Sequence, residues 1–315
     1  MKKIDNPLRI KVTGKCNRDC AFCHHEGGDN CIEDIYPDKT LRNHIRKMCG
    51  QLNISAAALT GGEPLMRYDL PRLADFLHTD CRFEKIYMTS NGTIRKDASF
   101  WKEMKECGLA KVNISVPDVI SEYKRNSEIA KDIFQNQLHN IANINELDIN
   151  VDINVVVFSD YMYTEYVINT LNSLKTDKLK FHIYLLPNLE VHAYERSIKT
   201  IKKICKKMGY KEDYTCLMPG ISNASRRYHD SVGNQLFVKS TERNSKVFLL
   251  PGLCDNCTKR EECMEGFYGI RLEKREGKYL IRLCLLKSTE DVLIPIDGFF
   301  DSSIYRILQK QWDII

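Results

Sequence analysis

Residues 12–23 read Val-Thr-Gly-Lys-Cys16-Asn-Arg-Asp-Cys20-Ala-Phe-Cys23, and the apolar stretch before them, Leu8 to Val12, has the pattern of a β-strand. The three cysteines follow a C-x3-C-x2-C spacing on one loop. Since four cysteines usually hold a four-iron cluster, three thiolates would hold three corners and leave one iron open to a small molecule. A zinc knuckle or three unrelated core cysteines is the alternative for the triad alone, because free Cys is among the most buried residue types.

Length and composition narrow the class of protein. The 315 residues suffice for one large domain with an appendage or for two domains, and 43% hydrophobic residues predict an ordinary core. The net charge of +5 with no dense Lys/Arg block does not imply nucleic acid. The chain has no apolar run of membrane-spanning length and no secretory h-region, so we expect a cytoplasmic protein away from membranes. Thirteen cysteines in such a chain favour metal over disulfides.

Strand-like and helix-like patterns alternate over the first two thirds of the chain. The predicted strands are Leu8–Thr13, Ser55–Thr60, Lys85–Thr89, Lys111–Val116, Asn150–Val157 and Lys180–Leu186. The predicted helices are Asp38–Gln51, Leu70–Thr79, Asp97–Cys107, Glu128–Asn145, Met162–Leu174 and Tyr194–Met208. Several strands are apolar on both faces, as in a covered parallel sheet. Six βα units therefore predict an α/β fold, a partial (β/α)6 barrel.

The alternation stops after about Tyr210. Residues 222–240 are polar and show no clear period, whereas residues 269–274 and 279–286 read as two strands joined by a turn. We expect a barrel domain over residues 1–212 and a small α+β domain over residues 213–315.

A second group of cysteines lies in the later part of the chain. Cys254, Cys257, Cys263 and Cys284 have a C-x2-C-x5-C-x20-C spacing. Four cysteines could close the ligand set of an auxiliary four-iron cluster, and a structural zinc site is the alternative. If one of the four is not a ligand, an open iron could hold substrate, and the spacing does not decide this point.

Polar and glycine-rich motifs lie at or near the C-terminal ends of the first five predicted strands, where parallel αβ barrels gather functional groups. They are the cysteine loop, Thr60–Pro64, Thr89–Gly92, Ser115–Asp118 and Asn154–Val157. Together they resemble the radical S-adenosylmethionine (radical SAM) enzymes over roughly residues 8–190. The resemblance is closest to the branch that contains the GTP 3',8-cyclase of molybdenum-cofactor biosynthesis.

That resemblance implies cofactors and ligands. An open iron of a [4Fe-4S] cluster on Cys16, Cys20 and Cys23 would chelate SAM, whose cleavage releases a 5'-deoxyadenosyl radical that takes a hydrogen atom from substrate. Glu63 would accept a hydrogen bond from the ammonium group of SAM, and Phe22 would lie near the adenine. The expected SAM contacts are Phe22, Gly61, Gly62, Glu63, Pro64, Ser90, Asn91, Ser115, Asn154 and Leu185. The second cysteine group resembles the twitch or SPASM appendage of the same branch, which favours an auxiliary [4Fe-4S] cluster over zinc.

The substrate is predicted from where the chain departs from the cyclases. Arg9 and Arg271 match basic positions of those enzymes, but Ala56–Leu59 replaces basic residues, Asp152 replaces a lysine, and the chain ends without their Gly-Gly tail. We therefore expect a sugar, peptide or other secondary metabolite, changed by epimerisation, oxidation or cross-linking, with Asp152 favouring a neutral or cationic molecule. GTP cyclisation is the alternative, and a non-catalytic zinc or iron–sulfur module is the alternative of another class.

Several further residues are candidates for roles at the site. Cys216 could return a hydrogen atom to substrate, although an inert packed thiol is the alternative reading. A flavodoxin or ferredoxin is the expected electron donor. The candidate substrate contacts are Arg9, His25, Asp152, Glu265, Tyr268 and Arg271.

Overall fold

The structure is a computed structural model, and it describes part of the chain. The described residues are 7–20, 23, 29, 31–116, 127–157, 161–175, 181–188, 191–217, 223–241, 249–263, 269–285, 287 and 292–312.

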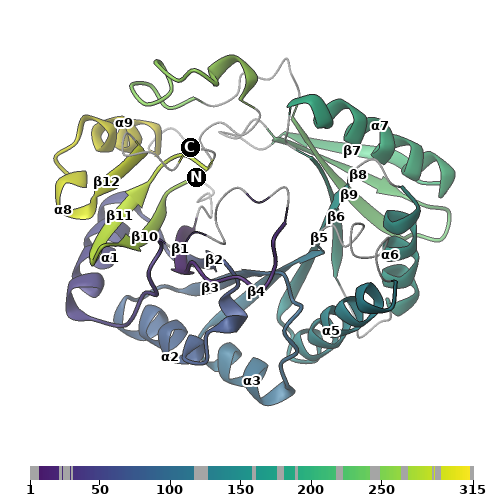
Figure 1. Ribbon diagram of the computed structural model, residues 1–315, viewed down its shortest axis with the longest axis horizontal. Helices are drawn as coiled ribbons and strands as arrows, with labels where there is room; N and C mark the ends of the chain where they lie inside the picture. Colours follow the sequence, from purple (N-terminus) through teal and green to yellow (C-terminus); the bar gives the residue numbers. More distant parts are fainter. Residues whose placement is uncertain are drawn as a thin grey trace.

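A parallel sheet with helices on one face forms the first part of the molecule. Its strands are β1 (Leu8–Thr13), β2 (Ala56–Gly61), β3 (Lys85–Ser90), β4 (Leu109–Val116), β5 (Asn150–Val157) and β6 (His182–Pro187), which pair in chain order. The helices are α1 (Lys39–Leu52), α2 (Leu70–Asp75), α3 (Ala98–Glu106), α5 (Ser127–Glu146), α6 (Tyr161–Leu174) and α7 (Val191–Lys207). Figure 1 shows the sheet curving with these helices along its outer side. The predicted α/β class is confirmed.

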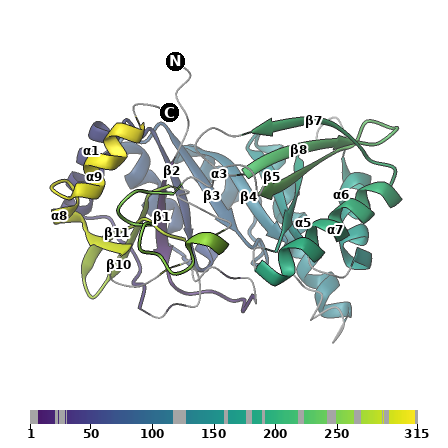
Figure 2. The same ribbon diagram turned by 90° about the horizontal axis from the view of Figure 1, so that it is seen from above.

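The later strands extend the same sheet at both edges. β7 (Lys211–Leu217), β8 (Asn223–His229) and β9 (Gln235–Thr241) form a meander that joins β6 through β9. β10 (Arg271–Arg275), β11 (Lys278–Arg282) and β12 (Leu293–Pro295) join β1 through β10. The two additions lie at opposite ends of the molecule (Figure 2). A division into domains at residue 212 stays a prediction, because strands from beyond that residue complete both edges of the sheet.

Two sequence expectations for the later part have different outcomes. The predicted hairpin is confirmed: Arg275 pairs with Lys278, and Glu276 and Gly277 between them have φ values of 48° and 73°, as in the type I′ turn that suits the twist of a hairpin. The polar segment without a period is in fact two strands, β8 and β9. The short helices of the later part are η3 (Arg260–Glu262), α8 (Ile296–Phe299) and α9 (Ser303–Trp312).

Alternation along the strands separates an apolar face from a polar face. Ile153 and Val155 of β5 are buried in the core beneath the helices. Ser115 and Asn154 pair in register and share the other face, the concave one in Figure 1. Lys11 lies on that concave face of β1, between the core residues Ile10 and Val12. Polar side chains therefore gather on the concave face of the sheet.

None of the described helices is long and apolar enough to cross a membrane.

Candidate active site

The Gly-Gly-Glu turn at the end of β2 is pressed against the backbone that leads into the cysteine loop. Gly62 N donates to Thr13 O at 2.8 Å, and Glu63 N donates to Lys15 O at 2.8 Å. A Cβ at Gly61 would lie 2.3 Å from Thr13 O, and one at Gly62 would lie 1.9 Å from Lys15 O. Only glycine permits this approach, and it places Glu63 beside Cys16.

Glu63 is a fully buried carboxylate with three hydrogen bonds. Its Oε1 accepts from Leu65 N at 2.9 Å and from Ser90 Oγ at 2.7 Å, and its Oε2 accepts from Asn91 N at 2.7 Å. Burial raises the pKa of Glu63, against the effect of those bonds. Because an ionised carboxyl has about four acceptor positions, the described residues leave one position on Oε2 for a further donor.

The cysteine loop is linked to the loop after β3. Asn17 donates to Thr93 Oγ1 at 2.8 Å and accepts from Asn91 Nδ2 at 2.9 Å. Burial raises the pKa of Cys20 to about 11, and the negative charges of Cys23 and Cys16 add to the effect. Burial raises the pKa of Cys16 as well, with Glu63 and Cys23 contributing. The cysteines of this loop thus contribute to one another's pKa, and Glu63 contributes to that of Cys16.

Amide side chains of α5 hold the loop after β3 through hydrogen bonds to its backbone. Gln137 Nε2 donates to Asn91 O at 2.6 Å and to Ser115 O at 3.1 Å. Asn140 Nδ2 donates to Gly92 O and Ile94 O, each at 2.9 Å, and its Oδ1 accepts from Lys96 N at 3.0 Å. Our sequence interpretation missed this clamp. Its signal was an amide row on one helix face, formed by Asn136, Gln137, Asn140 and Asn143.

The predicted SAM contacts do not all come together. Ser115 and Asn154 lie side by side on the concave face. Leu185 has no exposed surface, packs in the core and lies on the opposite face from Asn154 and Tyr184. The side chain of Leu185 therefore points away from Ser115 and Asn154, because a one-residue offset along a strand turns a side chain to the other face. Phe22, His25, Glu265 and Tyr268 lie outside the described residues, and the side chain of Cys216 in β7 is not described either.

Asp152 is already paired. Its Oδ2 forms an ion pair with Lys111 Nζ, and its Oδ1 lies 3.1 Å from His182 Nδ1. Burial works to raise the pKa of Asp152, but these two neighbours lower it overall. Beside this group, the rings of Tyr184 and Phe237 stack at 5.1 Å. The carboxylate therefore faces the concave side with its charge largely met.

The two arginines expected near substrate lie on neighbouring strands. Arg9 of β1 and Arg271 of β10 are partners in register, and Arg271 is almost fully buried. They come from positions more than 260 residues apart in the chain.

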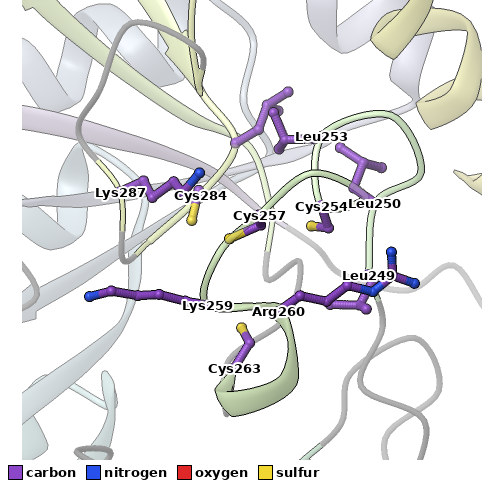
Figure 3. Close-up of a pocket in the computed structure, with 11 residues that line it drawn as sticks. Leu249, Leu250, Leu253, Cys254, Cys257, Lys259, Arg260, Cys263, Cys284 and Lys287 are labelled. Carbon is purple, nitrogen blue, oxygen red and sulfur yellow. The ribbon is translucent and has the colours of Figure 1, made fainter.

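All four cysteines of the second group line one small cavity (Figure 3). Leu250 O accepts from Cys254 N at 2.9 Å, and Cys254 O accepts from Cys257 N at 3.2 Å, so a tight turn presents the first two. Cys284 follows β11. In the described part of the chain, no three His, Cys, Asp or Glu side chains are arranged as ligands of a metal ion. The cavity measures about 40 Å³, whereas one water needs about 10–15 Å³, so the space between the cysteines exceeds that of a single small ion.

The chain is similar to known proteins over different parts of its length. Residues 10–172 match the sequence model of the Radical SAM superfamily. A probable GTP 3',8-cyclase of Archaeoglobus fulgidus is 37% identical over 123 residues, which span 39% of each chain. A probable GTP 3',8-cyclase of Methanocaldococcus jannaschii is 24% identical over 308 residues, which span 92% of this chain and 88% of that one. The crystal structure of Streptococcus suis SuiB bound to S-adenosylmethionine is 16% identical with a TM-score of 0.44, over 64% of this chain and 48% of that chain.

Proposed function

The chain belongs to the radical SAM superfamily, and on that premise we propose that its cysteine loop and Gly-Gly-Glu turn bind SAM for hydrogen abstraction from a small-molecule or peptide substrate. Family membership makes the chain an enzyme with a [4Fe-4S] cluster and SAM as cofactors. We propose which residues hold this cluster and SAM, that a second cluster is present, and which class of substrate is bound.

One observation carries the assignment of the SAM site: the buried Glu63 keeps an acceptor position and lies next to Cys16. A buried carboxylate is most stable when a cation meets it, and the ammonium group of SAM is such a cation. A four-iron cluster bound here would supply the electron for cleavage of SAM to the 5'-deoxyadenosyl radical. Cys16, Cys20 and Cys23 would hold that cluster, and Ser115 and Asn154 would contact the rest of SAM from the concave face.

The second group of cysteines supports an auxiliary [4Fe-4S] cluster. Four thiols around one cavity are the usual ligand number for such a cluster, and the cavity has room for more than one atom. If Cys254, Cys257, Cys263 and Cys284 all act as ligands, this cluster would not bind substrate directly. It would then support the wall of the site or pass an electron.

For the substrate we favour a sugar, peptide or other secondary metabolite over GTP. A triphosphate calls for several cations, yet the residues before the Gly-Gly-Glu turn are the buried Ala56, Ala57 and Ala58. Asp152 pairs with Lys111 and His182, so it adds little negative charge and a neutral substrate fits better than a cationic one.

GTP cyclisation is the second candidate, because the two relatives reported above are named as probable GTP 3',8-cyclases. Arg9 and Arg271, side by side in β1 and β10, are the residues that favour it.

Two assays test these proposals. Anaerobically reconstituted enzyme with a reductant and SAM should form 5'-deoxyadenosine, and the Cys16→Ala variant should form none; a variant that stays active would overturn the assignment of the cysteine loop. Equilibrium dialysis with GTP separates the substrates. Binding at micromolar GTP, followed by SAM-dependent loss of GTP, would replace our first choice with the second.

A further inference from the structure

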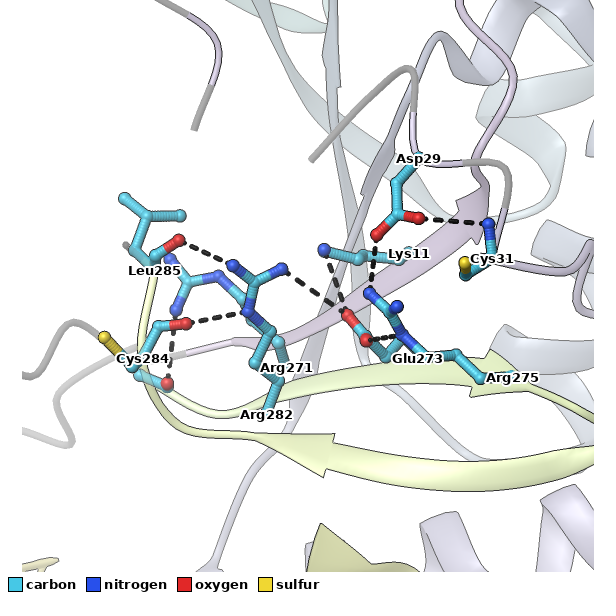
Figure 4. Close-up of polar contacts among 10 residues, drawn as sticks. Lys11, Asp29, Cys31, Arg271, Glu273, Arg275, Arg282, Cys284 and Leu285 are labelled. Atoms are coloured by element: carbon cyan, nitrogen blue, oxygen red, sulfur yellow. Dashed lines mark hydrogen bonds and ion pairs between the residues drawn. The ribbon is translucent and has the colours of Figure 1, made fainter. Parts of the chain in front are cut away.

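Glu273 of β10 is a fully buried carboxylate surrounded by basic side chains. Lys11 Nζ lies 3.0 Å from its Oε2, Arg275 Nε lies 2.5 Å from its Oε1, and Arg282 NH1 lies 3.7 Å from Oε2 (Figure 4). Lys11 and Arg282 are fully buried too. Because a buried charge is tolerated only when it is paired, Glu273 fixes the positions of one lysine from β1 and two arginines from its own hairpin.

Arg282 connects Glu273 with the second group of cysteines. Arg282 Nε donates to Cys284 O at 2.8 Å, and its NH2 donates to Leu285 O at 2.7 Å. The same guanidinium faces Glu273 through NH1. The backbone of Cys284, which lines the cysteine cavity, is therefore held by a side chain that Glu273 holds.

Arg275 and Lys11 connect Glu273 with the two ends of the first cysteine loop. Arg275 NH2 donates to Asp29 Oδ2 at 2.6 Å, and Asp29 Oδ1 accepts from Cys31 N at 3.0 Å. Asp29 follows the loop, whereas Lys11 lies on β1, the strand that leads into it. The hairpin also bonds to the segment that follows Asp29, because Glu33 N donates to Lys274 O at 2.8 Å.

We propose that Glu273 is a positioning residue that ties the first cysteine loop to Cys284 and so sets how each proposed cluster is held. The inference rests on the proposed function, since it needs both clusters. The partners of Glu273 described above are basic side chains, so it acts through Arg282 on one side and through Arg275 and Lys11 on the other. If Glu273 only stabilised the fold, its loss would weaken both sites alike. In our proposal the two arginines act on different clusters.

The test compares four variants. Arg282→Met removes the donors to Cys284 O and Leu285 O and leaves Glu273 paired with Lys11 and Arg275. Arg275→Met removes the tie to Asp29 and leaves Arg282 in place. Glu273→Gln removes the hub, and Glu276→Gln makes the same chemical change at an exposed position of the same hairpin.

The readouts are iron and sulfide per chain, the electron paramagnetic resonance (EPR) spectrum of the reduced protein, and circular dichroism as a check of folding. A Cys16→Ala chain and a Cys254→Ala/Cys257→Ala chain assign each signal to one cluster. The wild type should hold about eight irons. In Arg282→Met we expect only the signal of the second cluster to shift or to fall at least twofold, and in Arg275→Met only that of the first. Glu273→Gln should change both, and Glu276→Gln neither.

Each outcome decides between the proposals. Wild-type protein with about four irons would overturn the auxiliary cluster, and this inference with it. A wild type with about eight irons, whose folded Arg282→Met and Arg275→Met variants keep both spectra or lose both signals equally, would overturn the positioning role alone. Because these two variants leave Glu273 with two partners each, the result stands even if Glu273→Gln does not fold.

Discussion

Single residues at the site are constrained by what touches them. Gly62 has no room for a side chain because Lys15 O lies where a Cβ would be, and this closeness brings Glu63 to the cysteine loop. Glu63 in turn orders Ser90 and Asn91. The site thus depends on Gly62, which takes no part in chemistry, and on the buried carboxylate of Glu63, which we propose binds a cation.

Replacing Glu63 with Gln tests that role. The amide keeps the size of the side chain but loses the charge, so a charge-assisted hydrogen bond to the ammonium of SAM is lost. Such bonds contribute about 1.5–3 kcal/mol, so the Kd for SAM should rise roughly 10- to 150-fold. Isothermal titration of the reconstituted enzyme measures it. Glu84→Gln, an exposed carboxylate before β3, is the control, and an unchanged Kd in Glu63→Gln would remove Glu63 from the SAM site.

Which residues were predictable depends on whether their signal was local. The cysteine triad, Glu63 and the Ser115–Asn154 pair follow from motifs at strand ends, and the structure pairs Ser115 with Asn154 in register. The face taken by Leu185 was not predicted. The structure turns its side chain into the core, away from Asn154, and its contact with SAM stays a prediction. The pairing of Asp152 with Lys111 and His182 was also hidden, since it depends on the register of three strands.

Among the elements, α5 links packing to the site most directly. Its apolar residues Phe134, Ile141 and Ile144 enter the core, and its amides grip the loop after β3. A helix that is anchored in the core by one face can hold a loop rigidly with the other, and that loop contacts the cysteine loop through Asn17.

Asn140→Ala should loosen that loop. It removes four hydrogen bonds from a fully buried position, the longest of them from Trp101 Nε1 at 3.4 Å. Two carbonyls, one backbone N–H and the indole N–H lose this partner, so we expect a loss of about 2–4 kcal/mol in the free energy of unfolding. Urea denaturation measures the loss, and the affinity for SAM should fall with it. Asn143→Ala is the matched control one turn further along, because Asn143 donates a single bond to the loop, at 3.2 Å to Lys96 O. Equal losses in the two variants would contradict the clamp.

The turn of the β10–β11 hairpin offers a stabilising change. Glu276 has a φ of 48°, a left-handed conformation that asparagine adopts more readily than glutamate. Glu276→Asn should therefore raise the melting temperature, with a gain of about 0.5 kcal/mol, and leave iron content unchanged. Glu261→Asn, an exposed glutamate outside the hairpin, should show no such gain. A lower melting temperature for Glu276→Asn would contradict the turn geometry.

At the level of elements, the sequence pattern located most strands and helices but not their partners. The predicted strand 111–116 is β4, which begins two residues earlier. The predicted helix 70–79 divides into α2 and a π-helical turn, η2 (Phe76–Asp80). The strands of the meander at the far edge were missed because their alternation is weak in a polar segment. No local pattern could show that β10 pairs with β1, since a hairpin signal contains nothing about the edge it joins.

The whole molecule is held together by one sheet whose edges come from the last third of the chain. β9 covers the free edge of β6, and β10 covers that of β1. The covered edge of β1 carries Lys11, which has no exposed surface and pairs with Glu273 of β10. A cut at the predicted domain boundary would therefore do more than expose two strand edges, because it would leave a buried lysine without its carboxylate.

We therefore expect that residues 1–212 do not form a stable domain alone. Breaking a buried ion pair by removing one partner costs about 3–5 kcal/mol, a large part of the roughly 5–15 kcal/mol that stabilises a domain, and the loss of apolar packing from β9 and β10 adds to it. Thermal melts followed by circular dichroism, with the fragment and the whole chain side by side, measure the difference.

Lys11→Met decides whether the buried charge is the cause. In the fragment, methionine replaces an unpaired cation with an apolar side chain of similar length and should recover part of the stability. In the whole chain the same change removes a partner of Glu273 and should lower the melting temperature. Opposite signs in the two backgrounds would show that the last third of the chain completes the core of the first. A fragment that melts cooperatively at the temperature of the whole chain would instead establish residues 1–212 as an independent domain and make the shared sheet a matter of docking.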